Sequence, residues 1–507
     1  MNQSKILDLD ALETFVRNQK AAGRKVVHCH GCFDLLHIGH IRHFQRAREM
    51  GDCLVVTITP DQFVNKGPGR PAFPEELRLE TIASLETVDA VAINRWAQAV
   101  ETIKKIKPDI YVKGVEYKNS DNDVTGGIKI EQDAIESVGG RLAFTEDIVF
   151  SSSNLINKFI SAYPKDVKDF LAAFSTRYTT ATISDYLKKT AGLSVLVVGE
   201  AIIDDYQYCE AIGKSSKEPT LAVRSLYSQR FAGGILAVAN HVASFTNNVS
   251  MLTFVGDTED QMDFIQQRMN PAIKGHYLRR KKSPTIVKKR LIEHYFFTKM
   301  LEVYTINDAE LEPEDENTLC ASLEKLAPQF DVVIVVDFGH SMMTHRAVET
   351  LCRTAKFLAV NTQANAGNMG YNVISKYPRA DYISLAEKEM RLEARNHRGE
   401  LAPMMAELSS KLNCPRVMVT RGSKGSMGLH AGEGTFHVPA LAQKIVDRVG
   451  AGDAVMSLSA LLACLQAPME LIAFVGNAVG AWAVSVVGNE KAIDRAALTK
   501  QIESLLK

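Results

Sequence analysis

Net charge is what this chain of 507 residues most plainly lacks, because 59 Lys and Arg side chains balance 59 Asp and Glu side chains. A neutral balance gives no support for nucleic acid or a membrane surface as a partner. A long unbroken apolar run is also missing. The most apolar region, 454–487, is interrupted by Gln466, Pro468, Glu470 and Asn477, so we expect two packed core helices there and no membrane span. The first five residues lack the apolar core of a signal peptide.

Cysteine is scarce as well, with eight residues and no spacing that resembles a disulfide framework. We therefore expect reduced thiols and a cytoplasmic protein. Cys29 and Cys32 form a Cys-x-x-Cys pair, which leaves a redox or zinc role open. No second pair lies near in sequence, so a structural role is the favoured interpretation.

Short apolar runs of strand length alternate with amphipathic helical patterns along most of the chain, which predicts parallel α/β sheets. The length predicts two or three domains. We place a first domain at 1–160, a linker at 161–192 and a second α/β domain at 193–507. Within the second domain, 206–231 alternates polar and apolar residues, which predicts strands outside the main sheet.

The stretch 31–40, Gly-Cys-Phe-Asp-Leu-Leu-His-Ile-Gly-His, follows an apolar run and precedes a helical pattern. It is therefore predicted to be a strand-to-helix turn. His37 and His40 would face the helix N-terminus, where backbone N–H groups and the helix dipole favour phosphate. A metal site or a structural histidine cluster is the alternative, since other histidines lie nearby: His28, His30 and His43.

This stretch resembles the nucleotide-binding motif of the cytidylyltransferase family, Gly-x-Phe-Asp-x-x-His-x-Gly-His, at every fixed position. The resemblance implies a Rossmann-like nucleotidylyltransferase in which a sugar phosphate attacks the α-phosphorus of ATP or CTP and releases pyrophosphate, with Mg²⁺ on the triphosphate. It implies His37, His40 and Lys66 as catalytic residues. Nucleotide-binding residues would be Gly31, Phe33, Asp34, Gly39, Lys113, Ser151, Ser152 and Ser153.

A second motif, Gly-Ala-Gly-Asp at 450–453, precedes a long apolar helix. Consecutive backbone N–H groups at a glycine-rich helix start can bind a transferring phosphoryl group, and Asp453 can accept the proton of an attacking hydroxyl. A plain helix cap after a tight turn is the alternative. The motif resembles that of the ribokinase-like (PfkB) sugar kinases, and Asp447 matches their upstream acidic residue.

Further matches to these kinases follow in order along the second domain. Nucleotide-binding residues would be Thr420, Gly422, Gly425, Gly450, Ala451 and Gly452, and substrate-binding residues Asp204, Gly233, Gly234 and Asn240. The heptose-kinase branch usually has Asp-Pro-Lys where this chain has Asn361, Thr362 and Gln363. The family's Asn-x-x-Glu reads Ala386 to Glu389, so the glutamate remains as an indirect Mg²⁺ residue and the asparagine is lost.

The two halves together resemble the bifunctional enzymes of ADP-heptose synthesis, with the domain order reversed. The resemblance implies nucleotide-sugar synthesis, with ATP-dependent phosphorylation of a sugar or sugar phosphate by the second domain. It also implies a homodimer formed through a β-lid at 206–231. A nucleotidylyltransferase whose kinase-fold domain only binds ligand and dimerises is the second hypothesis. A metal or redox protein built on Cys29 and the nearby histidines is the third.

Overall fold

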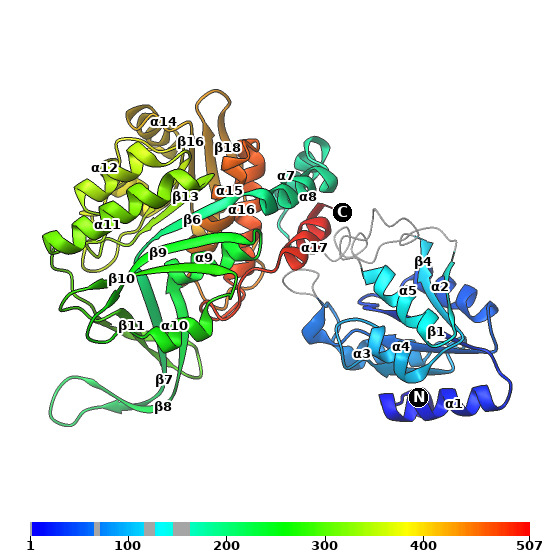
Figure 1. The fold of residues 1–507 in the computed structure, drawn as a ribbon. Helices are drawn as coiled ribbons and strands as arrows, with labels where there is room; N and C mark the ends of the chain where they lie inside the picture. Colours follow the sequence, from blue (N-terminus) through cyan, green and yellow to red (C-terminus); the bar gives the residue numbers. More distant parts are fainter. Residues whose placement is uncertain (1–2, 65–70, 116–126, 146–162, 507) are drawn as a thin grey trace. The chain divides into compact units, whose positions relative to one another are not determined.

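The computed structural model describes residues 3–64, 71–115, 127–145 and 163–506. The predicted site residues Lys66, Ser151, Ser152 and Ser153 lie outside these ranges. The chain divides into two compact units, one made of Met1–Tyr163 with Thr499–Lys507 and the other of Pro164–Leu498. Each unit contains its own α/β sheet (Figure 1).

The first unit is built on a five-stranded parallel sheet with the order β3-β2-β1-β4-β5. The strand order reverses between β1 and β4, and an open parallel sheet binds ligands beside the carboxyl ends of its strands at such a point. The strands are β1 (Val26–Gly31), β2 (Cys53–Ile58), β3 (Ala90–Ile93), β4 (Ile110–Gly114) and β5 (Arg141–Thr145).

Helices cover both faces of this sheet, which explains why its strands are apolar at successive positions. Val27 and Val56 pack with Phe44 of α2 and Ile82 of α3 on one face. Alternate strand residues pack against α1 on the other face, where α4 and α5 also lie. The helices are α1 (Leu9–Ala21), α2 (Ile38–Glu49), α3 (Glu75–Ala83), α4 (Val100–Ile106) and α5 (Gly127–Ser137).

The second unit contains a nine-stranded sheet with the order β10-β9-β6-β13-β14-β15-β16-β17-β18. It is parallel up to β16, and β17 and β18 continue it as antiparallel strands. The strands are β6 (Ser194–Gly199), β9 (Asn248–Gly256), β10 (Ile273–Arg280), β13 (Val332–Asp337), β14 (Leu358–Thr362), β15 (Tyr382–Ala386), β16 (Arg416–Thr420), β17 (Ser426–His430) and β18 (Gly434–Val438).

Two groups of helices cover the two faces of the nine-stranded sheet (Figure 1). On one face lie α11 (Pro313–Leu326), α12 (His345–Thr354), α13 (Glu387–Glu393) and α14 (Leu401–Lys411). On the other lie α9 (Ile235–Ala243), α15 (Ala451–Cys464) and α16 (Met469–Ala483). The packed pair α15 and α16 confirms the two core helices predicted for 454–487. Two further helices are α10 (Met262–Arg268) and α17 (Arg495–Leu506).

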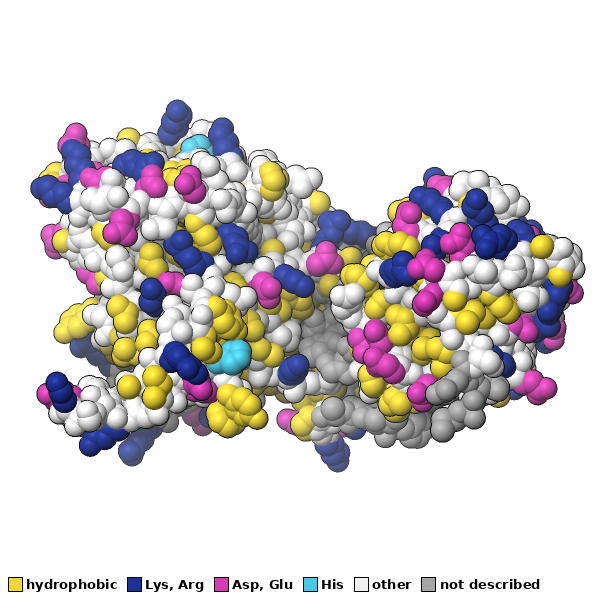
Figure 2. Space-filling view, turned by 90° about the horizontal axis from the view of Figure 1, so that it is seen from below, with side chains coloured by type: hydrophobic (Ala, Val, Ile, Leu, Met, Phe, Trp, Pro, Cys, Tyr) yellow, Lys and Arg dark blue, Asp and Glu magenta, His cyan; other side chains and the backbone are white. Residues whose placement is uncertain are grey.

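A separate four-stranded sheet, which we call the lid, has the order β12-β11-β7-β8. The predicted strands outside the main sheet are β7 (Ala201–Lys214) and β8 (Leu221–Gly234), which pair antiparallel. The lid also includes β11 (Ile286–Glu293) and β12 (Thr298–Thr305), which the sequence pattern did not predict. Apolar side chains of the lid are exposed: Leu221, Leu226, Tyr227, Leu301 and Val303. Figure 2 views the molecule from the side on which the lid hairpins project, and hydrophobic side chains are visible on that surface.

The described part of the predicted linker forms two helices, α7 (Lys165–Arg177) and α8 (Thr180–Lys189). The α7 helix packs on α16, because the rings of Phe174 and Phe474 stack at 4.2 Å and Arg177 forms a bidentate ion pair with Glu470. All eight cysteines are free thiols. Among the described residues, no helix combines the length and apolarity that crossing a membrane requires.

Candidate functional site

The motif at 31–40 forms the predicted turn between β1 and α2. It lies where the strand order of the first sheet reverses, between β1 and β4. His37 is the N-cap of α2, and its Nδ1 accepts the Gly39 N–H at 3.1 Å. The neutral ring therefore carries its proton on Nε2. Partial burial lowers the pKa of His37, which favours this neutral form. The His40 ring stacks on the His37 ring at 4.0 Å and 25°. The turn thus presents two imidazoles together at a helix N-terminus.

Phe33 packs against this pair of histidines, and its own backbone is strained. Its φ of 46° lies in the left-handed region, which costs a non-glycine residue about 1–3 kcal/mol. The ring meets His40 edge-on at 5.3 Å and Phe44 at 5.0 Å. A Cβ at Gly31 would lie 3.0 Å from the same ring, so this position favours glycine. Strain kept at a turn that carries two histidines is typical of a functional site.

Asp34 and Arg78 fasten the turn to the loop that follows β2. Asp34 accepts the N–H groups of Ala72 and Phe73 at 2.6 and 3.3 Å. The buried guanidinium of Arg78 donates to three carbonyl oxygens and one carboxylate: Cys32 O, Phe73 O, Thr59 O and Asp61 Oδ1. Sequence reasoning missed Arg78. Its signal was a charged residue on the apolar face of a predicted helix, next to Leu79 and Ile82.

The neighbouring histidines are structural. His28 and His30 both bond to the hydroxyl of Thr57, at 2.8 and 2.9 Å, and His43 bonds to Thr145 at 2.7 Å. Burial lowers the pKa of His28 to about 3 and of His43 to about 4, and it also lowers that of His30. Across the described ranges, no group of three or more His, Cys, Asp or Glu is arranged to hold a metal ion.

Lys113 lies at the end of β4, the strand beside β1 at the reversal. Its ammonium pairs with Glu131 at 2.9 Å and lies 5.3 Å from the centre of the Tyr111 ring. Its charge contributes to the lowered pKa of His43 on α2. The structure therefore brings Lys113 to the same edge of the sheet as the turn, although a carboxylate already neutralises part of its charge.

A cavity of about 280 Å³ opens in the second unit between the strand ends of the main sheet, the lid and the start of α15. Seven of the predicted residues line it: Asp204, Gly234, Glu389, Thr420, Gly450, Gly452 and Asp453. Three departures from the family patterns line it as well: Asn361 in β14, Gln363 directly after β14, and Ala386 at the end of β15. Sequence reasoning missed three cations of the lining: Lys288, Arg290 and Arg448.

The glycine-rich turn at 450–452 directs the start of α15 at this cavity. Gly450 has φ +80°, and a Cβ there would lie 2.3 Å from Asn489 Oδ1. Only glycine fits both conditions without strain. The first turn of a 14-residue helix, with its N–H groups and positive dipole end, therefore faces the space where an anion can bind.

Asp453 lies in the first turn of α15 and is buried. Burial raises its pKa to about 7, and the Gln363 amide opposes this shift by donating to Oδ1 at 2.5 Å. A carboxyl that titrates near neutral pH can accept a proton from a hydroxyl and release it again. This is the property that a general base requires.

The lid contributes three charged groups to the cavity. Arg290 forms ion pairs with Asp204 and, at 2.8 Å, with Glu302. A Cβ at Gly233 would lie 2.3 Å from Asp204 Oδ2, so this glycine allows the carboxylate to approach. Lys288 is only 6% exposed, and its ammonium lies over the rings of Tyr304 and Phe338 at 5.2 and 5.6 Å. Burial lowers the pKa of Lys288.

Asp447 links the lid to the glycine-rich turn. Its buried carboxylate accepts the hydroxyl of Tyr206 on β7 at 2.6 Å and pairs with Lys299 on β12. It also accepts the N–H groups of Val449 and Gly488 at 3.1 and 3.0 Å. These bonds lower its pKa despite the burial. Asp447 therefore organises the site without lining the cavity.

Side-chain oxygen atoms line the side of the cavity next to β14 and α13. Asn361 donates through Nδ2 to Ser384 O at 2.7 Å, and its buried Oδ1 has no hydrogen-bond partner within the described structure. Glu389 accepts the N–H groups of Ala364 and Ala386 at 3.1 and 2.7 Å, and burial raises its pKa. Two oxygen-bearing side chains thus face the cavity together.

Some predicted residues lie apart from the cavity lining. Asn240 uses its side chain to bind Arg268 O at 3.0 Å and Asn270 N at 2.9 Å, beyond α9. The structure therefore gives this asparagine a helix-to-loop contact and no place in the site. Four other predicted residues are neighbours of lining residues but do not line the cavity themselves: Gly422, Gly425, Ala451 and Gly233. Gly233 lies against the carboxylate of Asp204.

The sheet with its lid and glycine-rich turn defines a ribokinase-like sugar-kinase fold, joined to a Rossmann-like nucleotidyltransferase fold. A family described as pfkB family carbohydrate kinase matches residues 193–495, and a Cytidylyltransferase-like family matches residues 28–163. The first match spans more than half of the chain, and the chain belongs to the pfkB carbohydrate kinase family.

Curated relatives match the first unit. Bifunctional protein HldE of Methylobacillus flagellatus is 37% identical over 160 residues, and that of Geobacter metallireducens is 36% identical over 171. These alignments cover 31–32% of this chain and 31–33% of the relatives, so the chain spans about a third of their length. Phosphofructokinase-2 from Escherichia coli, in a crystal structure with potassium, covers 62% of this chain and all of its own at 14% identity and a TM-score of 0.50, a likeness of fold alone.

Proposed function

We propose that the first unit transfers a nucleotidyl group from ATP or CTP to a sugar phosphate with release of pyrophosphate. The single observation that carries this proposal is the stacked pair of His37 and His40 at the N-terminus of α2, where the sheet reverses. Nε2 of His37 is a neutral donor, which suits a phosphate oxygen that gains charge as the α-phosphorus is attacked. Asp34 and Arg78 hold the turn in place while this happens.

Release of pyrophosphate tests this proposal. The chain is incubated with each nucleoside triphosphate and several sugar 1-phosphates. His40→Ala should lower kcat at least a hundredfold with an unchanged circular dichroism spectrum, because one preorganised imidazole of the stacked pair is lost. His345→Ala, at an exposed histidine of α12, is the matched control and should keep full activity. Wild-type turnover in His40→Ala would contradict the assignment.

We propose that the second unit phosphorylates a sugar that already carries a phosphate, using ATP. The supporting observation is Lys288, a buried ammonium in the cavity lining that lies over two aromatic rings, while the neighbouring carboxylates Asp204 and Glu302 pair with Arg290. A buried cation is costly unless an anion joins it, and a phosphate of the substrate supplies that anion. Asp453 then accepts the proton of the attacking hydroxyl, and the start of α15 binds the transferred phosphoryl group.

The residues of this cavity fit Mg²⁺ carried by a triphosphate. Mg²⁺ prefers oxygen ligands and usually keeps several waters, so it does not require a protein cage of three carboxylates. The buried Asn361 Oδ1 and the Glu389 carboxylate can accept hydrogen bonds from such waters. The ion would supply charge neutralisation on the phosphates.

Consumption of ATP in the presence of a panel of sugars and sugar phosphates tests the kinase proposal. Lys288→Met should raise KM for a phosphorylated sugar more than tenfold. Lys289→Met is the matched control, because Lys289 points to the half-exposed side of the same strand and pairs with Asp205. Equal ATP turnover in the wild type and Asp453→Asn would refute Asp453 as the base.

The second hypothesis, a kinase fold that only binds ligand and dimerises, is retained by one observation. The heptose-kinase branch has a lysine at the position of Gln363, and this chain has a neutral amide there. Phosphate transfer to any sugar would exclude this hypothesis.

We further propose that the chain forms a homodimer through the exposed apolar side chains of the lid. We place this homodimer in the cytoplasm, where free thiols persist. Val303→Asp should then produce a monomer in sedimentation.

A further inference from the structure

Gln363 is the first residue after β14, and its side chain reaches across the cavity to the start of α15. Its Nε2 donates to Oδ1 of Asp453 at 2.5 Å. Among the described residues, this is the hydrogen bond that the Asp453 carboxylate makes through its side chain. One amide therefore controls the direction in which this carboxylate points.

The backbone of Gln363 is held on both sides. Its N–H donates to Asp337 O at 2.8 Å, and its carbonyl accepts from Asn372 Nδ2 at 3.2 Å. Asp337 is itself buried and fixed by the Tyr377 hydroxyl at 2.8 Å and the Lys376 ammonium at 2.5 Å. The amide is thus presented from a rigid strand end.

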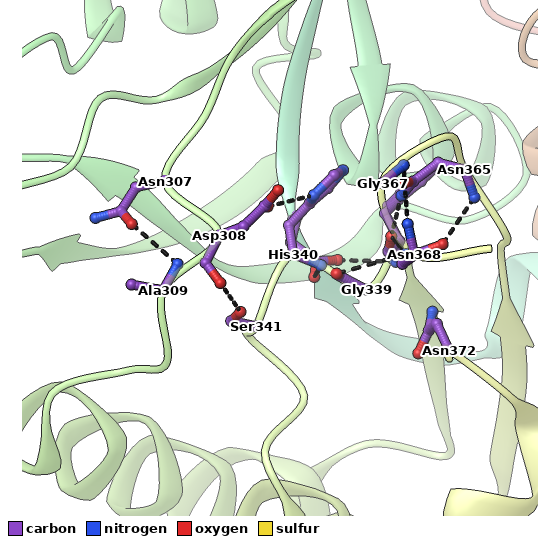
Figure 3. A network of polar contacts seen from close by, with 12 residues as sticks. Asn307, Asp308, Ala309, Gly339, His340, Ser341, Asn365, Gly367, Asn368 and Asn372 are labelled. Atoms are coloured by element: carbon purple, nitrogen blue, oxygen red, sulfur yellow. Dashed lines mark hydrogen bonds and ion pairs between the residues drawn. The ribbon is translucent and has the colours of Figure 1, made fainter. Parts of the chain in front are cut away.

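The loops next to Gln363 are fixed by a second network (Figure 3). Asn365 and Asn368 both donate to Phe338 O at 2.8 Å, which joins the loop after β14 to the loop after β13. His340, in that second loop, turns its Nδ1 to Asp308 at 2.9 Å. These hydrogen bonds hold the loops on both sides together, so the backbone position from which the Gln363 side chain extends is fixed.

We propose that Gln363 is a positioning residue of phosphoryl transfer, whose amide holds Oδ1 of Asp453 so that Oδ2 faces the substrate hydroxyl. This inference rests on the proposed kinase activity of the second unit. The hydroxyl gives its proton to Oδ2 as its oxygen bonds to the γ-phosphorus, and the bond from that phosphorus to the bridging oxygen breaks and leaves ADP with the electron pair. A lysine at 363 would also hold the carboxylate, but its charge would weaken the base.

The other charged groups around Asp453 come from several elements. They are Asp204 on β7, Lys288 and Arg290 on β11, Glu389 on α13, and Arg448 before α15. Burial raises the pKa of Asp453 to about 7, and the amide of Gln363 is the strongest influence that lowers it. Removing the amide should therefore make Asp453 harder to ionise.

Two measurements on the full chain test the inference. The first is the infrared carboxyl band of Asp453, which is assigned by its absence in Asp453→Asn and followed against pH. In Gln363→Leu its midpoint should rise by about one pH unit, the shift typical of a lost hydrogen bond to a carboxylate. In Gln363→Lys it should fall. Gln363→Glu preserves the shape of the side chain and should raise the midpoint, which covers the case in which the leucine variant does not fold.

The second measurement is the pH profile of kcat for ATP-dependent phosphorylation. The acidic limb should move with the infrared midpoint, and kcat should fall about tenfold in Gln363→Leu while KM for the sugar stays constant. Gln267→Leu on the exposed face of α10 is the control. An unchanged midpoint in Gln363→Leu and Gln363→Glu would overturn the inference and leave the kinase activity standing. If the midpoint shifts in the variants but the wild-type chain phosphorylates no sugar, the kinase activity is refuted, and with it the positioning role in transfer.

Discussion

Replacing Arg78 should destabilise the first unit and disorganise its histidine turn together. The Arg78 side chain is 1% exposed and donates to the carbonyl oxygens of Cys32, Thr59 and Phe73. In Arg78→Met these three partly buried acceptors lose a charged donor. Each such loss costs about 1–2 kcal/mol, so the free energy of unfolding should fall by about 3–6 kcal/mol. The Asp61 pair adds little to this figure, because that carboxylate is 37% exposed and regains water.

Urea unfolding measured by tryptophan fluorescence checks this value. The chain has two tryptophans, so Trp482→Phe leaves Trp96 as the reporter of the first unit. With a slope of about 2 kcal/mol/M, the midpoint should fall by about 2 M. Arg95→Met removes a pair with Asp10 whose partners are both more than half exposed, and its midpoint should stay within about 0.5 M. Equal midpoints in Arg78→Met and Arg95→Met would refute the reasoning.

Three further outcomes follow from the two sites. Asp34→Asn retains a side chain of the same shape, yet the rate of pyrophosphate release should fall at least tenfold. The reason is that the amide binds the Ala72 N–H more weakly than the carboxylate does. Stopped assays with saturating substrates check this rate. Asp453→Asn should stabilise the second unit at pH 8. The pKa of Asp453 is raised when folded, so its ionisation destabilises the fold as pH rises from about 4 to about 7. Thermal unfolding should therefore show a larger gain at pH 8 than at pH 5. Lys299→Met should lower the melting temperature of the second unit by several degrees, because it leaves the buried Asp447 without its cation; an unchanged temperature would contradict the role of that pair.

The strand-to-helix turns could be predicted from sequence because local rules determine them. The turn at 31–40 and the start of α15 both combine a preceding loop or strand, glycines and a helical pattern, and both were found where predicted. The strands of the two main sheets were predictable because burial on both faces leaves continuous apolar runs. The β-strands at 206–231 were visible because one face of the lid is exposed.

Strand β11 escaped prediction for a physical reason. Its buried positions alternate correctly, at residues 286, 288, 290 and 292, but two of the four are Lys288 and Arg290. Charges on the inward face cancel the hydrophobic periodicity by which a strand is recognised. The same two residues place positive charge in the cavity lining, so the charges that conceal the strand in the sequence are those that face the cavity. Arg78 was hidden in the same way within α3.

The contacts of Asn240 could not be predicted, because a motif gives spacing along the chain and not direction around a helix. On α9 its side chain binds Arg268 O and Asn270 N and does not line the cavity. The pairing of Gln363 with Asp453 joins residues 90 positions apart, and no local pattern could reveal it.

The bonds of Asp447 have a consequence for the timing of catalysis. Moving the lid away from the glycine-rich turn would separate the Asp447 carboxylate from both Tyr206 and Lys299, and would leave the buried charge with only the N–H groups of Val449 and Gly488 and without a cation. The resting enzyme should therefore spend most of its time with the lid down, and a sugar should enter only during brief openings. The observed rate of sugar binding would then become independent of sugar concentration when that concentration is high. Opening of the lid would limit the turnover of the kinase, and phosphoryl transfer would not.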